Sequence, residues 1–246
     1  GHGVTWFLVS ILASFIKVNG KEFRKKILTE DWHSRLHSAH PERWRNRAGE
    51  MPTPFSVITA EEVRIGLWQY QGSSEMQQKM LEYLVANEAT ANRHRIWPPH
   101  CIKGTWGQLI YEPLMASCLQ WGVRNNTSPL HFRKGGAEIP EHYGAFYAEV
   151  KDSTDISTME NWDLLNELEE LDEIVIAGLA RDICVARTAE QLIELSEVGV
   201  SEFRVAEKLV FLSDCTAAVD EANGESFFFR MRELGARVCT SQELFA

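Results

Sequence analysis

The sequence predicts an α/β fold with three layers, in which a mostly parallel β-sheet carries helices on both faces. Short apolar runs, of the length of buried strands, alternate along the chain with longer segments whose apolar residues recur at helical spacing. Several of these short runs also end in a glycine or in polar residues, as residues 174–177 do before Gly178. Such runs are typical of parallel strands that are buried on both faces.

Length and charge limit the possible functions. The chain has 246 residues, of which 44% are hydrophobic, enough to bury a large core. Acidic residues outnumber basic residues by 35 to 25, and the formal net charge of -10 argues against a nucleic-acid partner. The five cysteines are widely spaced, odd in number and without a Cys-x-x-Cys pair, which favours reduced thiols in the cytoplasm.

The N-terminal part predicts a helix, a strand and a long loop. Residues 4–18 are densely apolar and end at Asn19 and Gly20, which predicts a helix. The run is too short for a membrane span and lacks the flanks of a signal peptide, so we expect no membrane partner. A strand is expected at 26–29. Residues 34–74 are irregular and contain Pro-Thr-Pro, so we expect an ordered loop inserted into a single domain, residues 1–246.

The remaining sequence continues the alternation. Helices are expected at residues 74–86, 108–120, 162–171, 185–198 (stopping near Gly199) and 227–234. Strands are expected at residues 95–96, 130–133, 174–177, 208–212 and 237–239. Because parallel strands direct their C-terminal ends to one edge of the sheet, reactive residues that follow these strands are expected to meet in one cleft.

Cys184 lies between a predicted strand and a predicted helix. The unpaired N–H groups of a helix N-terminus favour a thiolate, so we expect a lowered thiol pKa and a nucleophile. A small apolar side chain buried in the core is the alternative. Lys134 follows another strand, and an ammonium group beside the cysteine would lower the thiol pKa further. The alternative for Lys134 is an ordinary surface lysine.

Asp31 and His33 follow the first predicted strand, and His100 follows the strand at 95–96. Together, and with His40 as a further candidate, they form a set of oxygen and nitrogen donors suited to zinc, manganese or iron. Asp-x-His alone is weak evidence for a metal site. Its alternative is a loop carboxylate beside a solvated imidazole.

Several motifs then occur in one order: Trp-Pro-Pro-His-Cys at 97–101, Gly-Thr at 104–105, Lys-Gly at 134–135, Tyr-x-Ala-Phe at 143–146 and Gly-Leu-Ala-x-Asp-x-Cys-Val at 178–185. They closely resemble the nicotinamidase/pyrazinamidase branch of the isochorismatase-like cysteine hydrolases, from about residue 4 to the C-terminus. Asp-Trp-His at 31–33 looks like that family's metal motif. The resemblance implies a doubly wound α/β sheet and a cytoplasmic enzyme of NAD metabolism and pyridine nucleotide salvage. Such an enzyme hydrolyses a small amide, such as nicotinamide, to a carboxylate and ammonia.

The resemblance also implies a role for each matching residue. Cys184 would be the nucleophile that forms a thioester, and Lys134 would support its thiolate. The N–H groups of Ala180 and Cys184 would form an oxyanion hole, and the 179–180 peptide matches the place of a cis bond in the family. Trp97 and Tyr143 would bind the substrate, with a purely structural tryptophan as the alternative for Trp97.

A divalent metal ion is the cofactor that the resemblance implies. Asp31, His33 and His100 would bind it, and in such enzymes the metal coordinates the pyridine nitrogen of the substrate. Zinc is expected before iron or manganese. His40 matches a fourth ligand less well, because the spacing after His33 differs from the common pattern. Members of the family assemble in several ways, so a homo-oligomer is compatible with the sequence.

The sequence departs from the family pattern in two places. The family's first strand carries a catalytic aspartate in a motif like Asp-x-Gln-Asn-Asp-Phe, and none precedes Asp31. This departure leaves three alternatives. The chain is a fragment, another segment takes the place of the first strand, or the protein is a member of the family that has lost catalysis and binds a small ligand or a protein. The insertion at 34–74 is the second departure, and it leaves another amide or a carbamoyl compound as an alternative substrate.

Overall fold

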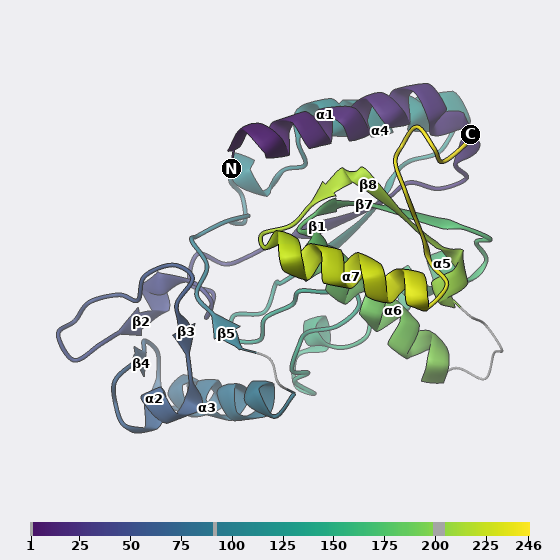
Figure 1. Ribbon diagram of the computed structural model, residues 1–246. Coiled ribbons are helices and arrows are strands. Elements are labelled where there is room, and N and C mark those ends of the chain that lie inside the picture. Colours follow the sequence, from purple (N-terminus) through teal and green to yellow (C-terminus); the bar gives the residue numbers. More distant parts are fainter. Residues whose placement is uncertain (1, 91–92, 199–204) are drawn as a thin grey trace.

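The computed structural model describes residues 2–90, 93–198 and 205–246 (Figure 1). Its main strands are β1 (Ile27–Asp31), β6 (Leu130–Lys134), β7 (Ile174–Leu179), β8 (Leu209–Ala217) and β9 (Arg237–Cys239). Helices α1 (His2–Asn19) and α4 (Glu112–Asn125) cover one face, and α6 (Ala186–Val198) and α7 (Glu221–Glu233) cover the other (Figure 1). The predicted three-layer α/β fold is confirmed.

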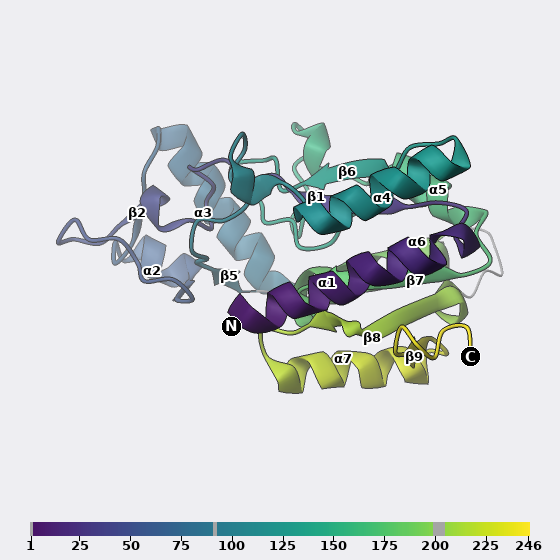
Figure 2. The same ribbon diagram turned by 90° about the horizontal axis from the view of Figure 1, so that it is seen from above.

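The strands are parallel, but they form two separate groups. β1 pairs with β6 in a register that sets Asp31 opposite Lys134 at the C-terminal ends of the two strands. β7, β8 and β9 form the other group, in that order. Among the residues that the structure describes, no ladder joins β1 to β7. The sheet is therefore interrupted between these two strands, beneath α1 and α4 (Figure 2).

The largest core cluster lies between β8 and the helices below it. The side chains of Phe211 on β8 and of Phe227 and Phe228 on α7 are almost completely buried. The ring centroids of Phe211 and Phe227 lie 5.2 Å apart in an edge-to-face arrangement, which adds to the burial energy of both rings. α7 begins where the Asp220 carboxylate accepts a hydrogen bond from the Asn223 N–H. α7 is thereby fixed on the sheet next to the segment that carries Cys184.

Residues 34–90 and 93–96 form a separate region beside the sheet (Figures 1 and 2). The prediction of an irregular loop at 34–74 is wrong, because this segment contains regular elements: β2 (Trp44–Arg45), β3 (Val57–Ile58), α2 (Ala60–Arg64) and β4 (Gln69–Tyr70). With α3 (Ser74–Ala89) and β5 (His94–Arg95) they enclose a second core around Trp44, Tyr70 and Met80. Strands of two residues leave no alternating pattern in a sequence, which is why these elements were not expected. The single domain with an insertion stays a prediction.

Several helices and strands begin or end at residues other than the predicted ones. α4 begins at Glu112 rather than at 108, because Pro113 fits only its first turn and residues 106–108 form a separate 3-10 turn. α7 begins six residues before the predicted start at 227, and β8 continues five residues beyond 212. α5 (Trp162–Glu169) lies close to its prediction. The predicted stop at Gly199 falls outside the described residues. Within those residues, no helix combines the length and the apolarity that crossing a bilayer requires.

Replacing Phe211 by alanine tests the importance of this core. Phe211→Ala removes a buried ring and leaves a cavity, so the free energy of unfolding should fall by about 3–5 kcal/mol in urea denaturation. Phe229→Ala is the matched control, since that ring on α7 is 62% exposed, and it should change stability little. Equal losses for the two variants would contradict this account of the core.

Candidate active site

An ion pair forms at the C-terminal ends of β1 and β6. The Lys134 ammonium group is buried, and its Nζ lies 2.5 Å from Asp31 Oδ1. It also donates a hydrogen bond of 2.8 Å to the His142 carbonyl oxygen. Burial alone would lower the pKa of Lys134, but the Asp31 carboxylate outweighs burial and raises it. Burial likewise acts to raise the pKa of Asp31, and Lys134 lowers it overall. Both groups are therefore charged near neutrality.

Cys184 joins this pair. The structure brings Lys134 Nζ to 3.7 Å from Cys184 Sγ, although the two residues are 50 positions apart in the sequence. Cys184 lies in η5, a π-helical segment (Arg181–Val185) that continues directly into α6. The Asp182 carboxylate secures η5 by accepting hydrogen bonds from the Val219 and Asp220 N–H groups, at 2.8 and 2.9 Å. Carboxylate, ammonium and thiol thus meet at one edge of the sheet.

The predicted low pKa of Cys184 is wrong. Burial raises the pKa of this thiol to about 11, although Lys134 and a hydrogen bond from the Ala180 N–H both lower it. Cys184 lies in the first turn of the continuous helical segment formed by η5 and α6, but burial outweighs the effect of the helix N-terminus on its pKa. The Leu179–Ala180 peptide is cis, as the family resemblance implied. The Cys184 side chain is half-buried and neutral at pH 7.

Two groups of side chains in the described residues could hold a metal ion. One consists of Asp31, His33 and His100, and the other of His33, His37 and Glu141. Within each group the ligand atoms lie within 4.8 Å of one another. His33 and His100 meet because the chain around Ile102 forms a parallel bridge with His33. His40 is in neither group, although its ring centroid lies 5.5 Å from that of His100.

The hydrogen bonds made by the ring nitrogen Nδ1 distinguish these histidines. The Nδ1 atoms of His33, His40 and His100 face the carbonyl oxygens of Gly135, Arg35 and Pro98, at 3.1, 3.3 and 3.0 Å. A carbonyl can only accept, so each Nδ1 carries the proton and each Nε2 has a free lone pair. Histidine ligands of metals commonly have this arrangement. Burial lowers the pKa of His33 to about 4, against an opposing effect of Asp31, so its ring is neutral at pH 7.

His37 has the opposite arrangement. Its Nδ1 accepts a hydrogen bond of 3.1 Å from the Ala39 N–H, so the proton of the neutral ring lies on Nε2. His37 Nε2 and Glu141 Oε2 are both buried without a hydrogen-bond partner. Burial raises the pKa of Glu141 to about 7. The donor chemistry therefore fits a metal at Asp31, His33 and His100, with His40 next to them, better than at the second group.

Gly135 allows His33 to approach β6. Its φ of +71° is in the left-handed region, which favours glycine. A Cβ atom at this position would clash with His33 Cε1. Any side chain there would displace the imidazole ring and with it the Nδ1 contact to the Gly135 carbonyl.

Trp97 and Tyr143 lie next to each other at the edge of a cavity. The Trp97 Nε1–H donates a hydrogen bond of 3.3 Å to the Tyr143 hydroxyl oxygen. Both residues line a cavity of about 640 Å³, which also touches Ile183 but not Cys184. Gln191 supports the loop after Tyr143, because its side-chain amide accepts from the Phe146 N–H at 3.0 Å and donates to the Tyr147 carbonyl at 2.7 Å. Sequence reasoning missed Gln191 and Glu141, since a single amide or carboxylate has no diagnostic spacing.

The C-terminal part of the chain matches a known protein family. Residues 134–243 match the profile of the isochorismatase domain. The predicted resemblance is thus confirmed, and the matching residues of this domain include Lys134 and Cys184.

Proteins similar to this chain include a nicotinamidase from Saccharomyces cerevisiae. It is 23% identical over 190 residues, which are 76% of this chain and 70% of the relative. Among solved structures, the Acinetobacter baumanii nicotinamidase/pyrazinamidase matches with a TM-score of 0.61 at 22% identity, over 96% of this chain and 86% of that one. The pyrazinamidase of Pyrococcus horikoshii in complex with zinc matches with a TM-score of 0.52 at 15% identity, over 95% and 84% of the two chains.

The reactivity of Cys184 should depend on Lys134. With a thiol pKa of about 11, alkylation by iodoacetamide should accelerate about tenfold per pH unit between pH 7 and 10. Lys134→Met removes the nearest positive charge and should slow alkylation at pH 8 about tenfold or more. Mass spectrometry of the Cys184 peptide measures the rate. Lys79→Met, an exposed change on α3, should leave it unchanged. Equal rates in all three proteins would contradict the assigned contact.

Metal binding should distinguish the two groups of ligands. His100→Ala should weaken zinc binding at least about tenfold, because it removes a donor with a free Nε2. His37→Asn keeps an acceptor for the Ala39 N–H and should leave the affinity unchanged. Competition with a chromogenic chelator measures both affinities. A larger loss in His37→Asn than in His100→Ala would favour the group with Glu141.

Proposed function

We propose that this chain hydrolyses a small amide, of the kind represented by nicotinamide, to a carboxylate and ammonia. The observation that carries the proposal is the contact among Asp31, Lys134 and Cys184, in which one ammonium group lies 2.5 Å from a carboxylate oxygen and 3.7 Å from a thiol sulfur. The relatives support the proposal, since both the Saccharomyces cerevisiae and the Acinetobacter baumanii proteins are nicotinamidases.

In the first half of the reaction, Cys184 is the nucleophile. Its sulfur attacks the carboxamide carbon, the C–N bond breaks, and ammonia leaves with the proton that the thiol has lost. The Lys134 ammonium group stabilises the transient thiolate by charge and by hydrogen bonding. Asp31 keeps Lys134 in place and keeps it protonated. The product is a thioester.

In the second half, water attacks the thioester carbon, and the C–S bond breaks to release the carboxylate and the thiol. The N–H groups of Ala180 and Cys184 are the proposed donors to the negative oxygen that forms in each half. The Ala180 backbone lowers the pKa of the Cys184 thiol, so it lies close to the sulfur that would attack the carbonyl carbon. Trp97 and Tyr143 are the proposed aromatic contacts of the substrate, from the adjoining cavity.

Asp31, His33 and His100 are the proposed ligands of a divalent metal ion, zinc before iron or manganese, with His40 as a fourth candidate. When bound, such an ion would supply a Lewis acid that holds a nitrogen atom of the substrate. The protein's contribution is to present neutral imidazoles whose Nδ1–H groups are fixed by backbone carbonyls. A zinc complex of the Pyrococcus horikoshii pyrazinamidase agrees with this choice of metal.

A catalytically impaired protein that binds a small ligand is the second candidate function. The raised pKa of Cys184 supports it, because few molecules carry a thiolate at pH 7. Another amide or a carbamoyl compound, handled by the same cysteine, remains a proposal for the substrate.

Ammonia release from nicotinamide tests the proposed reaction. In zinc-loaded protein, Cys184→Ala should reduce the rate at least about 10³-fold, since it removes the atom that forms the covalent intermediate. Cys239→Ala, on β9, is the control and should retain the wild-type rate. Hydrolysis that survives Cys184→Ala would contradict the mechanism. No hydrolysis of any amide by the wild-type chain would favour the binding protein.

A further inference from the structure

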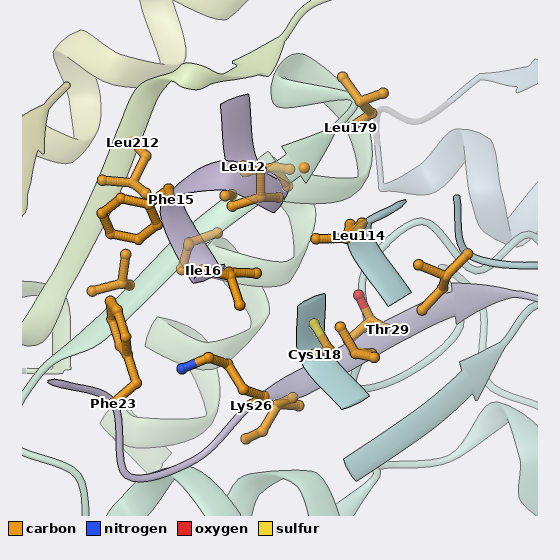
Figure 3. A pocket seen from close by; sticks show the side chains of 18 of the residues that line it. Leu12, Phe15, Ile16, Phe23, Lys26, Thr29, Leu114, Cys118, Leu179 and Leu212 are labelled. Atoms are coloured by element: carbon orange, nitrogen blue, oxygen red, sulfur yellow. The ribbon is translucent and has the colours of Figure 1, made fainter. Parts of the chain in front are cut away.

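Two cavities adjoin η5, and their walls differ in chemistry. One lies between the sheet and the helices α1 and α4, has a volume of about 300 Å³ and is lined mainly by apolar side chains such as Phe15, Ile16 and Leu114 (Figure 3). The other is the cavity of about 640 Å³ at Trp97 and Tyr143, whose wall also contains arginine and acidic residues. We call it the arginine cavity. A charged group of a ligand fits this second cavity better than the first.

An extended segment forms one wall of the arginine cavity. Successive residues of an extended chain point to opposite sides. His94 and Ile96 are buried against the second core, where they are 2% and 0% exposed. Arg93, Arg95 and Trp97 therefore point the other way, and all three line the cavity. Two guanidinium groups and an indole ring thus form one row along this wall.

Backbone hydrogen bonds hold the row in place. β5 pairs with β3, and the N–H groups of Ile96 and Trp97 donate to the carbonyl oxygens of Ser56 and Ala39, both at 2.8 Å. The guanidinium carbon of Arg95 lies 5.6 Å from the centre of the Trp97 ring, which is within the range of a cation–π interaction. The charged group and the aromatic ring are therefore neighbours on one fixed segment.

Arg93 and Arg95 have no acidic partner. Among the residues that the structure describes, neither guanidinium group forms an ion pair. The acidic groups of the opposite wall have partners of their own. These are Arg187 for Glu149 at 3.2 Å, Arg230 for Glu190 at 2.7 Å, the N–H groups of Val219 and Asp220 for Asp182, and the N–H group of Asn223 for Asp220. The uncompensated charges of the arginine cavity are thus two positive ones on a single wall.

The arginine cavity adjoins the reactive groups. Ile183 lines it and directly precedes Cys184 in η5. Tyr143 lines it as well. Burial is the main reason why the pKa of Tyr143 is raised well above its usual value, but the charge of Cys184 contributes, so the hydroxyl group is within electrostatic reach of the sulfur. A ligand whose amide carbon lies at Cys184 can therefore extend past Tyr143 towards Arg95.

We propose that the arginine cavity binds an anionic group, a carboxylate or a phosphate, which the substrate carries on its aromatic ring away from the amide. Arg95 and Arg93 bind the anion, because the planar fork of a guanidinium group matches two oxygens of either group. A cavity of about 640 Å³ is in the size range that buries a drug-sized ligand, so a substituted ring fits. This inference rests on the proposed amide hydrolysis and defines its substrate class as aromatic amides with an acidic substituent.

Binding to a protein that cannot turn the ligand over tests the anion site separately from hydrolysis. In zinc-loaded Cys184→Ala, isothermal titration calorimetry compares three probes: 5-carboxynicotinamide, 5-(phosphonomethyl)nicotinamide and the neutral 5-(hydroxymethyl)nicotinamide. At least one anionic probe should bind about tenfold or more tightly than the neutral probe, because charge-assisted hydrogen bonds to guanidinium groups are strong. The anion that binds more tightly shows whether the site is built for a carboxylate or a phosphate.

Arginine variants in the same background locate the site. Arg95→Met should remove most of the preference for the anionic probe and leave the affinity for the neutral probe unchanged. Arg95→Lys should retain only part of the preference, since a point charge replaces a planar fork. Arg64→Met is the matched control, because this arginine is exposed on α2 and outside the cavity, and it should retain the full preference. With Cys184 present, the ratio of kcat/KM for the anionic and neutral amides should follow the same order.

Two results would overturn the proposal. These are equal affinities for the anionic and neutral probes, and a preference that survives the double variant Arg93→Met/Arg95→Met. Circular dichroism shows whether each variant is folded, and Arg95→Lys, which keeps an aliphatic stem beside Trp97, decides the question if Arg95→Met is not. A preference for the anion without hydrolysis of any probe would support the anion site and contradict the proposed function. Hydrolysis without a preference would do the reverse.

Discussion

The buried ammonium group of Lys134 is the constraint on which the arrangement of the site depends. It forms an ion pair with Asp31 Oδ1 at 2.5 Å and donates hydrogen bonds to the His142 carbonyl at 2.8 Å and to Cys184 Sγ at 3.7 Å. Each neighbour comes from a different part of the chain. Because a buried charge without partners is strongly destabilising, the positions of β1, of the loop at 142 and of η5 are coupled through this one group.

The same burial limits how the sulfur can react. Removing water strengthens the attraction between the ammonium group and a thiolate, but it costs the thiolate its hydration, and the second effect is the larger one at Cys184. A thiol with a pKa of about 11 is protonated at neutral pH. In the proposed reaction, the proton would therefore leave the sulfur during the attack on the amide, and the departing amine would be the base that gains strength as the C–N bond breaks.

The sequence predicted the fold and most of the convergence at the sheet edge, because strand ends, turn residues and motif order are local features. It could predict that Lys134 and Cys184 lie near each other, since parallel strands share an edge. It could not predict the pKa of Cys184, which depends on burial by distant residues. Nor could it predict which histidines offer a free Nε2 to a metal ion. The tautomer of His37 depends on the Ala39 N–H, and that of His33 depends on the Gly135 carbonyl. The short strands of residues 34–74 left no periodic pattern.

The interruption of the sheet bears on the site as well as on the core. Asp31 is the last residue of β1, and among the described residues β1 pairs only with β6, at the point where the Asp31 carboxylate meets Lys134. A strand at the edge of a sheet is held by one ladder and opens more readily than a central strand, which is held by two. The position of the Asp31 carboxylate relative to Lys134 and Cys184 therefore depends on the ladder between β1 and β6.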